Sequence, residues 1–286
     1  MDYSLIRDPR DWVKSDILGT GRWGTVYLAR NPKYPLNLIA IKTVSFSADY
    51  SPFSEREVLE ALQPCPEIIN CYGDDFVTEQ DGQVVYHLLL EYAPGGTLHD
   101  LIKNSSSGGK LPEINVRGYT RMILKGVIRM HQKGYFHNDL KATNILVFPS
   151  EDGVIDDHVK IADFNLVKKV EFGLCMSCEK YHDVSSGDLF KCGCVTFEES
   201  IDILALGGLV TEMVTGEPAK WSIVWEGVTG KQNKWRSTFC PKKPEILEGM
   251  SDDGKDFLRR CLVEEPRERW KANMLLNHPF VAKDGS

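Results

Sequence analysis

The sequence predicts an α+β fold of two lobes, a small β-rich lobe followed by a larger helical one. Short β-favouring runs fill the first third of the chain, and apolar residues at helical spacing dominate the remainder. The change falls at the run Ala93-Pro-Gly-Gly96, which interrupts regular structure. The joint between the lobes is expected near Glu91–Gly95, and the length by itself allows one large domain or two modest ones.

The small lobe is predicted to contain four strands and one helix. Glycine, proline and asparagine separate the β-favouring runs from one another. The helix should begin near Ser54, since this residue can cap the first turn and Glu57 lies three residues on, as in a capping box. The strands are expected at residues 12–18, 25–29, 38–44 and 84–92, and the helix at 54–62.

The large lobe is predicted to be helical because apolar side chains recur there at helical intervals. Tyr119, Ile123 and Val127 fall on one face of a helix, together with Met122 and Met130. Residues 202–214 are apolar almost all round, which indicates a buried helix, and residues 252–263 form an amphipathic one.

Length and composition argue against several classes of protein. The 286 residues are 42% hydrophobic and 26% charged, close to the averages of soluble globular proteins. The formal charge of −7 argues against nucleic acid as the main partner, because a phosphate backbone attracts basic proteins. No run approaches the length of a membrane span, and residues 1–12 do not resemble a secretory signal. We therefore expect an intracellular protein without a membrane partner, cytoplasmic or shared between cytoplasm and nucleus.

A glycine-rich motif lies between the first two predicted strands and reads Leu18-Gly-Thr-Gly-Arg-Trp-Gly-Thr-Val26. A dinucleotide-binding turn would open a helix and precede an acidic residue, whereas here a strand follows, and Lys42 lies 18 positions after Gly24. A P-loop would need Gly-Lys-Ser/Thr, but Thr25 follows Gly24 directly. The motif is therefore predicted to be a hairpin that folds over phosphate groups.

The third predicted strand carries one lysine among apolar residues, in the run Ile39-Ala-Ile-Lys42. A buried ammonium needs an anionic partner, and the following helix offers Glu55 and Glu57. Taken alone, the pattern fits better a strand lysine that points to solvent.

Two further motifs follow in the large lobe, His137-Asn-Asp-Leu-Lys-Ala-Thr-Asn144 and Ile161-Ala-Asp-Phe-Asn165. With the glycine motif and the strand lysine, their order resembles the eukaryotic protein kinases. The resemblance runs from about Trp12 to Val281 and includes a hinge-like run at 88–96. It implies one domain over residues 12–281, with lobes at about 12–92 and 93–281 and short tails at 1–11 and 282–286. The closing residues 261–281 look most like those of the MAP kinase kinase kinases, and of plant members in particular.

The resemblance implies ATP and Mg²⁺ as cofactors. Lys42 would hold the α- and β-phosphates, with Glu55 as its best-placed ion-pair partner and Glu57 as the runner-up. Asn144 and Asp163 would bind Mg²⁺. The glycine hairpin would cover the phosphates with Leu18, Gly19, Thr20, Gly21, Arg22, Trp23, Gly24, Thr25 and Val26.

The resemblance also implies the catalytic and adenine-binding residues. Asp139 would accept the proton of the substrate hydroxyl, and Lys141 would stabilise the γ-phosphoryl group, as in Ser/Thr-directed kinases. Ala40 and Leu146 would enclose the adenine. The backbone of Glu91 and Ala93 would hydrogen-bond the adenine edge, behind a gatekeeper at Leu90.

The sequence departs from the family pattern in three places. Asn138 replaces the arginine of H-R-D, which normally pairs with a phosphate on the activation loop, so control by loop phosphorylation is not expected. Asn165 replaces the glycine of D-F-G and stiffens the motif. No A-P-E precedes the buried helix, which leaves Asp188, Glu198 and Glu199 as acidic candidates for pairing with Arg269.

Four of the eight cysteines lie in the segment that departs most from the family. C-x-x-C followed by C-x-C can supply four thiolates to a tetrahedral Zn²⁺. The spacing of the second pair is not a standard one, and four reduced thiols are the alternative. The candidate zinc ligands are Cys175, Cys178, Cys192 and Cys194.

We therefore predict ATP- and Mg²⁺-dependent phosphorylation of Ser/Thr on a protein substrate, such as a MAP kinase kinase, with upstream or scaffold proteins as further partners. The principal alternative is a pseudokinase that serves as a nucleotide-binding or scaffold module. The retained phosphate- and metal-contacting residues favour the enzyme, whereas the three departures favour the pseudokinase. A small-molecule kinase of similar fold is a weaker third alternative.

Overall fold

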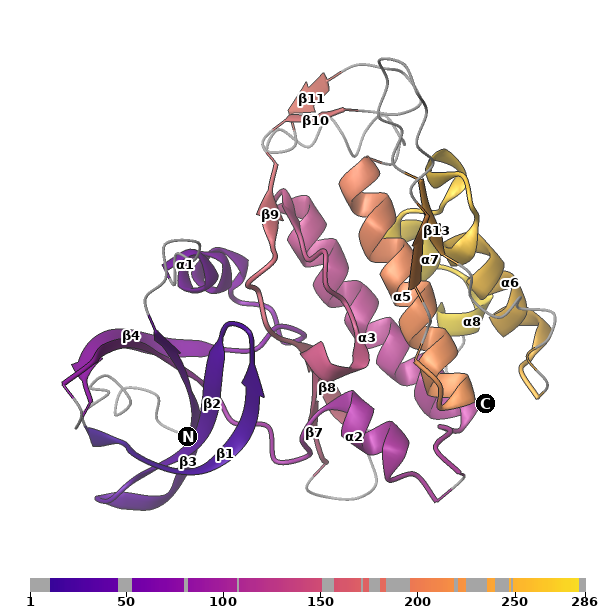
Figure 1. Cartoon of the computed structure of the whole chain (residues 1–286). Coiled ribbons are helices and arrows are strands. Elements are labelled where there is room, and N and C mark those ends of the chain that lie inside the picture. The colour runs from indigo at the N-terminus through magenta and orange to yellow at the C-terminus, as the bar shows by residue number, and fades with distance from the viewer. Residues whose placement is uncertain are drawn as a thin grey trace.

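A computed structural model shows a two-lobed chain (Figure 1). The structure describes only the backbone of residues 53, 54, 172–174, 181–183, 221–224 and 236–239. The described residues are 11–45, 53–79, 82–106, 108–150, 157–170, 172–174, 181–183, 196–218, 221–224, 236–239, 247 and 249–282.

The small lobe is a five-stranded antiparallel sheet in the order β1-β2-β3-β5-β4, accompanied by one helix. Alternate residues of β3 face different clusters, as the two-residue period of a strand requires. Ile39 and Ile41 pack with Leu89 in a small cluster, whereas Ala40 between them joins the main core. The elements are β1 (Val13–Gly21), β2 (Gly24–Asn31), β3 (Tyr34–Ser45), α1 (Phe53–Leu62), β4 (Cys71–Thr78) and β5 (Val84–Glu91).

The large lobe is built around two long helices, α3 (Glu113–Gln132) and α5 (Phe197–Thr215), which lie side by side (Figure 1). A capping box of Thr196 and Glu199 starts α5, and Gly216 ends it in the left-handed conformation. The shorter helices are α2 (Leu98–Lys103), α6 (Asp252–Leu262), α7 (Ala272–Leu276) and α8 (Pro279–Ala282).

Short strand pairs in the large lobe flank the loops at 137–144 and 162–167. β6 (Tyr135–Phe136) pairs with β9 (Lys168–Lys169), and β7 (Ile145–Phe148) pairs with β8 (His158–Ile161). Two further pairs complete the described strands: β10 (Phe172–Leu174) with β11 (Tyr181–Asp183), and β12 (Trp221–Val224) with β13 (Arg236–Phe239).

The predicted α+β fold class is confirmed, with a five-stranded sheet in front and helices behind. The helix expected at 54–62 begins one residue earlier, at Phe53, so Ser54 lies inside the helix rather than before it. β4 was not predicted, because Gly73, Asp74 and Asp75 disfavour a strand. Contacts made outside the strand stabilise it there: Asp74 accepts a hydrogen bond from the hydroxyl of Tyr86 at 2.7 Å.

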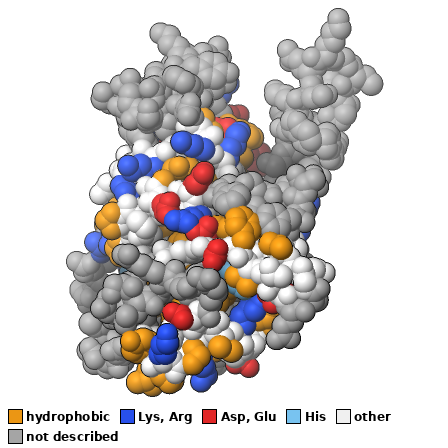
Figure 2. Space-filling view, turned by 90° about the vertical axis from the view of Figure 1, so that its left-hand side faces the viewer, with side chains coloured by type: hydrophobic (Ala, Val, Ile, Leu, Met, Phe, Trp, Pro, Cys, Tyr) orange, Lys and Arg blue, Asp and Glu red, His pale blue; other side chains and the backbone are white. Residues whose placement is uncertain are grey.

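The surface drawn in Figure 2 carries basic, acidic and apolar side chains interspersed with one another. Among the described helices, none combines the length and apolar character that crossing a membrane requires.

Candidate active site

The loop that carries Asp139 is anchored on the buried helix α5. The fully buried carboxylate of Asp202 accepts hydrogen bonds from the backbone N–H groups of His137 and Asn138, at 2.9 and 2.8 Å. It also lies 2.9 Å from Nε2 of His131 on α3. A buried carboxylate with three partners holds the loop rigidly, because losing any of them would leave a polar group unsatisfied.

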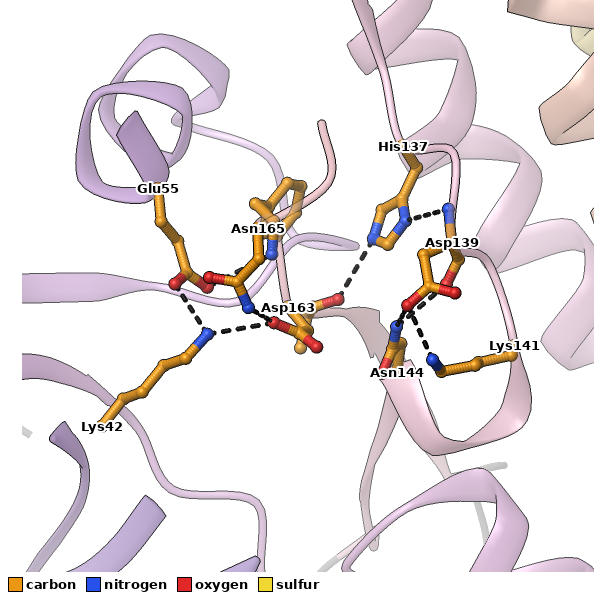
Figure 3. A network of polar contacts seen from close by, with 10 residues as sticks. Lys42, Glu55, His137, Asp139, Lys141, Asn144, Asp163 and Asn165 are labelled. Carbon is orange, nitrogen blue, oxygen red and sulfur yellow. Dashed lines mark hydrogen bonds and ion pairs between the residues drawn. The ribbon is translucent and has the colours of Figure 1, made fainter. Parts of the chain in front are cut away.

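Asp139 lies within a small network of polar side chains (Figure 3). Its Oδ2 accepts from Lys141 Nζ at 2.7 Å and from Asn144 Nδ2 at 3.0 Å. The neighbouring His137 is buried and engaged on both ring nitrogens, with Ala162 O at 3.1 Å and the backbone N–H of Asp139 at 3.3 Å. His137 therefore shapes the loop, whereas Asp139 and Lys141 are open to a substrate.

Lys42 links the two lobes of the site (Figure 3). Of the two candidate glutamates, Glu55 is its partner: Lys42 Nζ donates to Glu55 Oε2 at 2.7 Å, while Glu57 is exposed. Lys42 also donates to Asp163 Oδ1 at 3.0 Å. Burial alone would lower the pKa of the Lys42 ammonium, but the two carboxylates outweigh it, so this pKa is raised.

Glu55 also fixes the segment that carries Asp163. Its second oxygen, Oε1, accepts from the backbone N–H of Phe164 at 3.2 Å, and Phe164 is buried in the main core. Asp163 itself has a left-handed backbone, with φ of 63°. One buried carboxylate thus orients both the lysine and the turn at Asp163.

Asn144 and Asp163 have the chemistry of Mg²⁺ ligands. Because Nδ2 of Asn144 donates to Asp139, its Oδ1 is the atom left to act as a ligand. Asp163 adds a carboxylate, and its side chain is 37% exposed, hence reachable from solvent. Hard oxygen donors of this kind suit a hard cation, so the residues present fit Mg²⁺.

The glycine motif forms a tight hairpin between β1 and β2, in which Gly21 pairs with Gly24. Gly24 has φ of 125°, and a Cβ there would lie 2.3 Å from the carbonyl oxygen of Thr43. Only glycine fits this position. At the tip, the Arg22 guanidinium stacks 4.8 Å from the centroid of the Trp23 ring.

The apolar residues expected around the adenine come from both lobes. Ala40 is buried opposite Leu90 on β5, and Val26 lies opposite Lys42 on the neighbouring strand. Leu146 on β7 belongs to the large lobe and packs partly buried against the main core, whereas Leu18 on β1 is 45% exposed.

The hinge is held by a polar cluster that the sequence did not indicate. Lys160 on β8 contacts both carboxylate oxygens of Glu91, at 2.7 and 2.8 Å, and Asn70 Nδ2 donates to Oε2 at 2.9 Å. The N–H of Glu91 donates to Asn70 O at 3.0 Å, and the carbonyl of Ala93 accepts from Gly96 at 3.2 Å. The N–H of Ala93 and the carbonyl of Glu91 are thus the groups that suit an adenine edge.

Two of the departures from the family pattern have visible consequences. The short side chain of Asn138 turns back onto the backbone, with Nδ2 3.2 Å from Phe136 O and 3.4 Å from Leu166 O. Asn165 donates from its carboxamide to Oδ1 of Asp163. Asn138 thus lies where the family pattern has an arginine. A glycine at position 165 has no side chain and could not make the contact that Asn165 makes.

The expected carboxylate partner of Arg269 is not found among the described side chains. Its guanidinium donates instead to the carbonyls of Val263, Glu264 and Ser200, at 2.9, 3.3 and 3.0 Å. Burial lowers the pKa of Arg269 to about 10. The two described candidates are engaged elsewhere: Glu198 with Lys168, and Glu199 with the N–H of Thr196.

The remaining expectations concern the segment that departs most from the family pattern, and they fall outside the described residues. These are the acidic candidate Asp188 and the proposed zinc ligands Cys175, Cys178, Cys192 and Cys194. Within the described part of the chain, no group of three or more His, Cys, Asp or Glu side chains is arranged to hold a metal ion.

The fold and the site define a protein kinase domain, and the family model with that description matches residues 12–281. The chain therefore belongs to the protein kinase family.

Within the protein kinase family, relatives in Arabidopsis thaliana show that the chain is similar to serine/threonine kinases of the MAP kinase kinase kinase group. Mitogen-activated protein kinase kinase kinase 20 is 38% identical over 282 residues, which cover 96% of this chain and 79% of that protein. Mitogen-activated protein kinase kinase kinase 17 is 36% identical over a stretch that covers 95% of this chain and 69% of that protein. Kinase kinase kinase 3 is 32% identical, and this chain covers 42% of it.

Proposed function

We propose that the chain transfers the γ-phosphoryl group of ATP to a serine or threonine hydroxyl of a protein substrate. The observation that carries this proposal is the geometry of the two polar networks, Lys42–Glu55–Asp163 and Asp139–Lys141–Asn144. Phosphoryl transfer depends on positioning and on charge neutralisation rather than on covalent participation by the protein. Both requirements are supported by these side chains.

The reaction divides the work between the two networks. Lys42, kept cationic by Glu55, would hold the α- and β-phosphates against the glycine hairpin. Asp139 would orient the substrate hydroxyl and accept its proton as the oxygen–phosphorus bond forms. Lys141, 2.7 Å from Asp139, would neutralise charge on the transferred group as its bond to the ADP oxygen breaks.

Asn144 and Asp163 would hold Mg²⁺ through their side-chain oxygens. When bound by these two residues, the cation would neutralise negative charge on the phosphates. The backbone of Glu91 and Ala93, fixed by Lys160, would receive the adenine edge.

The substrate we propose is a MAP kinase kinase, because the relatives are named as MAP kinase kinase kinases. Lys141 supports serine or threonine as the acceptor, as the sequence resemblance implied. The shared identity extends over nearly the whole chain and so includes the large lobe.

The alternative is a pseudokinase, a module that binds nucleotide or partners without phosphoryl transfer. Asn138, Asn165 and the missing A-P-E favour it, because each departs from the pattern of the family. The enzyme remains the better account, since Asp139, Asn144 and Asp163 are all present and lie in contact with their neighbours.

Two measurements separate the alternatives. Radiolabelled transfer from Mg-ATP to a purified MAP kinase kinase should occur with the wild-type chain and be lost in Asp139→Asn. Equal transfer by the two proteins would reject the enzyme. A thermal shift with Mg-ATP then distinguishes a module that binds nucleotide from one that does not, because a ligand that binds only the folded state raises Tm.

A further inference from the structure

Asn165 makes a contact that the glycine at this place in the family motif cannot make. Its side-chain Nδ2 donates to Oδ1 of Asp163, two residues earlier. The same Oδ1 accepts from Lys42 Nζ at 3.0 Å. One oxygen of the Asp163 carboxylate therefore accepts from two donors, one on the small lobe and one two residues along the chain.

The second oxygen of Asp163 is oriented by this arrangement. Figure 3 shows it pointing away from Lys42 and Asn165, toward the side of the site where Asn144 lies. A carboxylate that is fixed through one oxygen cannot rotate freely about its χ2 torsion. The contact with Asn165 therefore adds to that with Lys42 in holding Oδ1, so that Oδ2 faces the side of Asn144.

We propose that Asn165 is a positioning residue for metal binding: its carboxamide fixes Asp163 so that Oδ2 faces Mg²⁺. This inference rests on the proposed function, since it concerns the same nucleotide site. Mg²⁺ demands nearly ideal octahedral geometry at short distances, so a ligand already in place binds it more tightly. Partners that orient a metal ligand typically contribute about 10–100-fold in metal affinity.

A competing effect has the opposite sign. A donor on a carboxylate withdraws negative charge and would by itself weaken metal binding. Here the donor lies on Oδ1, which Lys42 already occupies, and leaves Oδ2 without added competition. Orientation therefore outweighs the loss of charge, and removing the carboxamide should weaken metal binding.

The backbone allows a clean substitution. Among the described non-glycine residues, only Asn138 and Asp163 have positive φ, so Asn165 does not need the freedom of glycine. Asn165→Ala removes the carboxamide without backbone strain, and Asn165→Gly restores the family residue. Asn165→Gln keeps the carboxamide on a longer stem.

The test measures binding of Mn²⁺, a hard cation that favours the same oxygen ligands as Mg²⁺, by electron paramagnetic resonance. The full chain is saturated with ADP and titrated with Mn²⁺, and ADP affinity without metal is measured separately. Asn165→Ala and Asn165→Gly should each weaken Mn²⁺ binding by about tenfold or more. The metal-free ADP affinity should change by less than about twofold, because no contact to the nucleotide is removed.

Several results would overturn the inference. Mn²⁺ affinities within about twofold of wild type in Asn165→Ala would remove the orienting role. A loss in Asn165→Ala that is absent in Asn165→Gly would show that the missing carboxamide is not responsible, because both variants lack it. Equal losses of Mn²⁺ affinity and of metal-free ADP affinity would show a general defect. The melting temperature of each unliganded variant and the affinities of Asn165→Gln would confirm such a defect.

The proposed function fails in a distinguishable way. If the wild-type chain binds no ADP with or without metal, the nucleotide site itself is wrong, and the inference falls with it. If the wild type binds ADP but no Mn²⁺, nucleotide binding stands while the metal-positioning role of Asn165 is overturned.

Discussion

The substitution Glu55→Gln tests most directly the ion pair that connects Lys42 of the small lobe with the segment at Asp163 and Phe164. Glu55 is 2% exposed and joins Lys42 on β3 to the backbone of Phe164. Glutamine keeps the shape and one acceptor oxygen but removes the charge. Lys42 would then have Asp163 as its one remaining described carboxylate partner, and Asp163 would be drawn from the metal toward the ammonium.

The magnitude follows from the burial of the pair. Removing one partner of a buried ion pair costs about 3–5 kcal/mol of unfolding free energy. Asp163 still partly compensates Lys42, so we expect the lower end, about 3 kcal/mol. For a chain of this size each kcal/mol lowers Tm by about 2–4 °C, so the fall should be about 6–12 °C.

The assay compares Glu55→Gln with Glu57→Gln, two residues along the same helix at an exposed position. Thermal unfolding should show the fall in Tm for Glu55→Gln and nearly no change for Glu57→Gln, since surface substitutions usually shift stability by less than about 0.5 kcal/mol. Phosphoryl transfer should fall by about tenfold or more in Glu55→Gln alone, because the lysine loses its position. Equal Tm and equal transfer in the two variants would refute the account of this ion pair.

Two further predictions concern pH and phosphorylation. Glu113 is partly buried, which alone would raise its pKa, but hydrogen bonds from Ser251 and the Arg117 guanidinium outweigh this and lower the pKa below its usual 4.5. The stability that Glu113 contributes is therefore present above about pH 4.5 and is lost as pH falls through the lowered pKa. Glu113→Gln should lower Tm at pH 7 and flatten the loss of Tm on acidification, and an unchanged Tm profile from pH 7 to pH 3 would contradict this. Because Asn138 contacts backbone carbonyls instead of reaching outward, phosphatase treatment should leave phosphoryl transfer within about twofold of the untreated protein, and a large loss of transfer would show that a loop phosphate is needed.

Local patterns predicted much of the fold. The periodicity of α3, the all-round apolar character of α5 and the β-favouring runs of the small lobe each reflect burial of a face, which a sequence records directly. β4 escaped because Gly73, Asp74 and Asp75 oppose a strand locally, while pairing with β5 and the contact of Asp74 with Tyr86 come from elsewhere in the chain.

The candidate site was predictable where residues belong to contiguous motifs. Lys42, Asp139 and Asp163 could be named in this way, whereas their supports could not. Asp202 lies more than sixty residues from the loop it anchors, and no local pattern marks its contact with His137. The same holds for Lys160, a lone strand lysine whose partner Glu91 is far away in sequence.

The contact that Asn165 makes could not be predicted from the sequence. The sequence indicated a stiffer motif, but the contact between its carboxamide and Asp163 depends on side-chain geometry. An acidic partner was expected for Arg269 in place of the missing A-P-E, yet within the described residues its guanidinium donates to three backbone carbonyls.

The central claim, that this chain is a phosphoryl-transferring enzyme, is tested most directly by transfer of radiolabelled phosphate from Mg-ATP to a MAP kinase kinase. The wild-type chain should phosphorylate serine or threonine, and Asp139→Asn should be slower by about 10²–10⁴-fold, the usual contribution of a positioned base. Transfer that is undetectable in the wild type, or equal in the two proteins, would contradict the account.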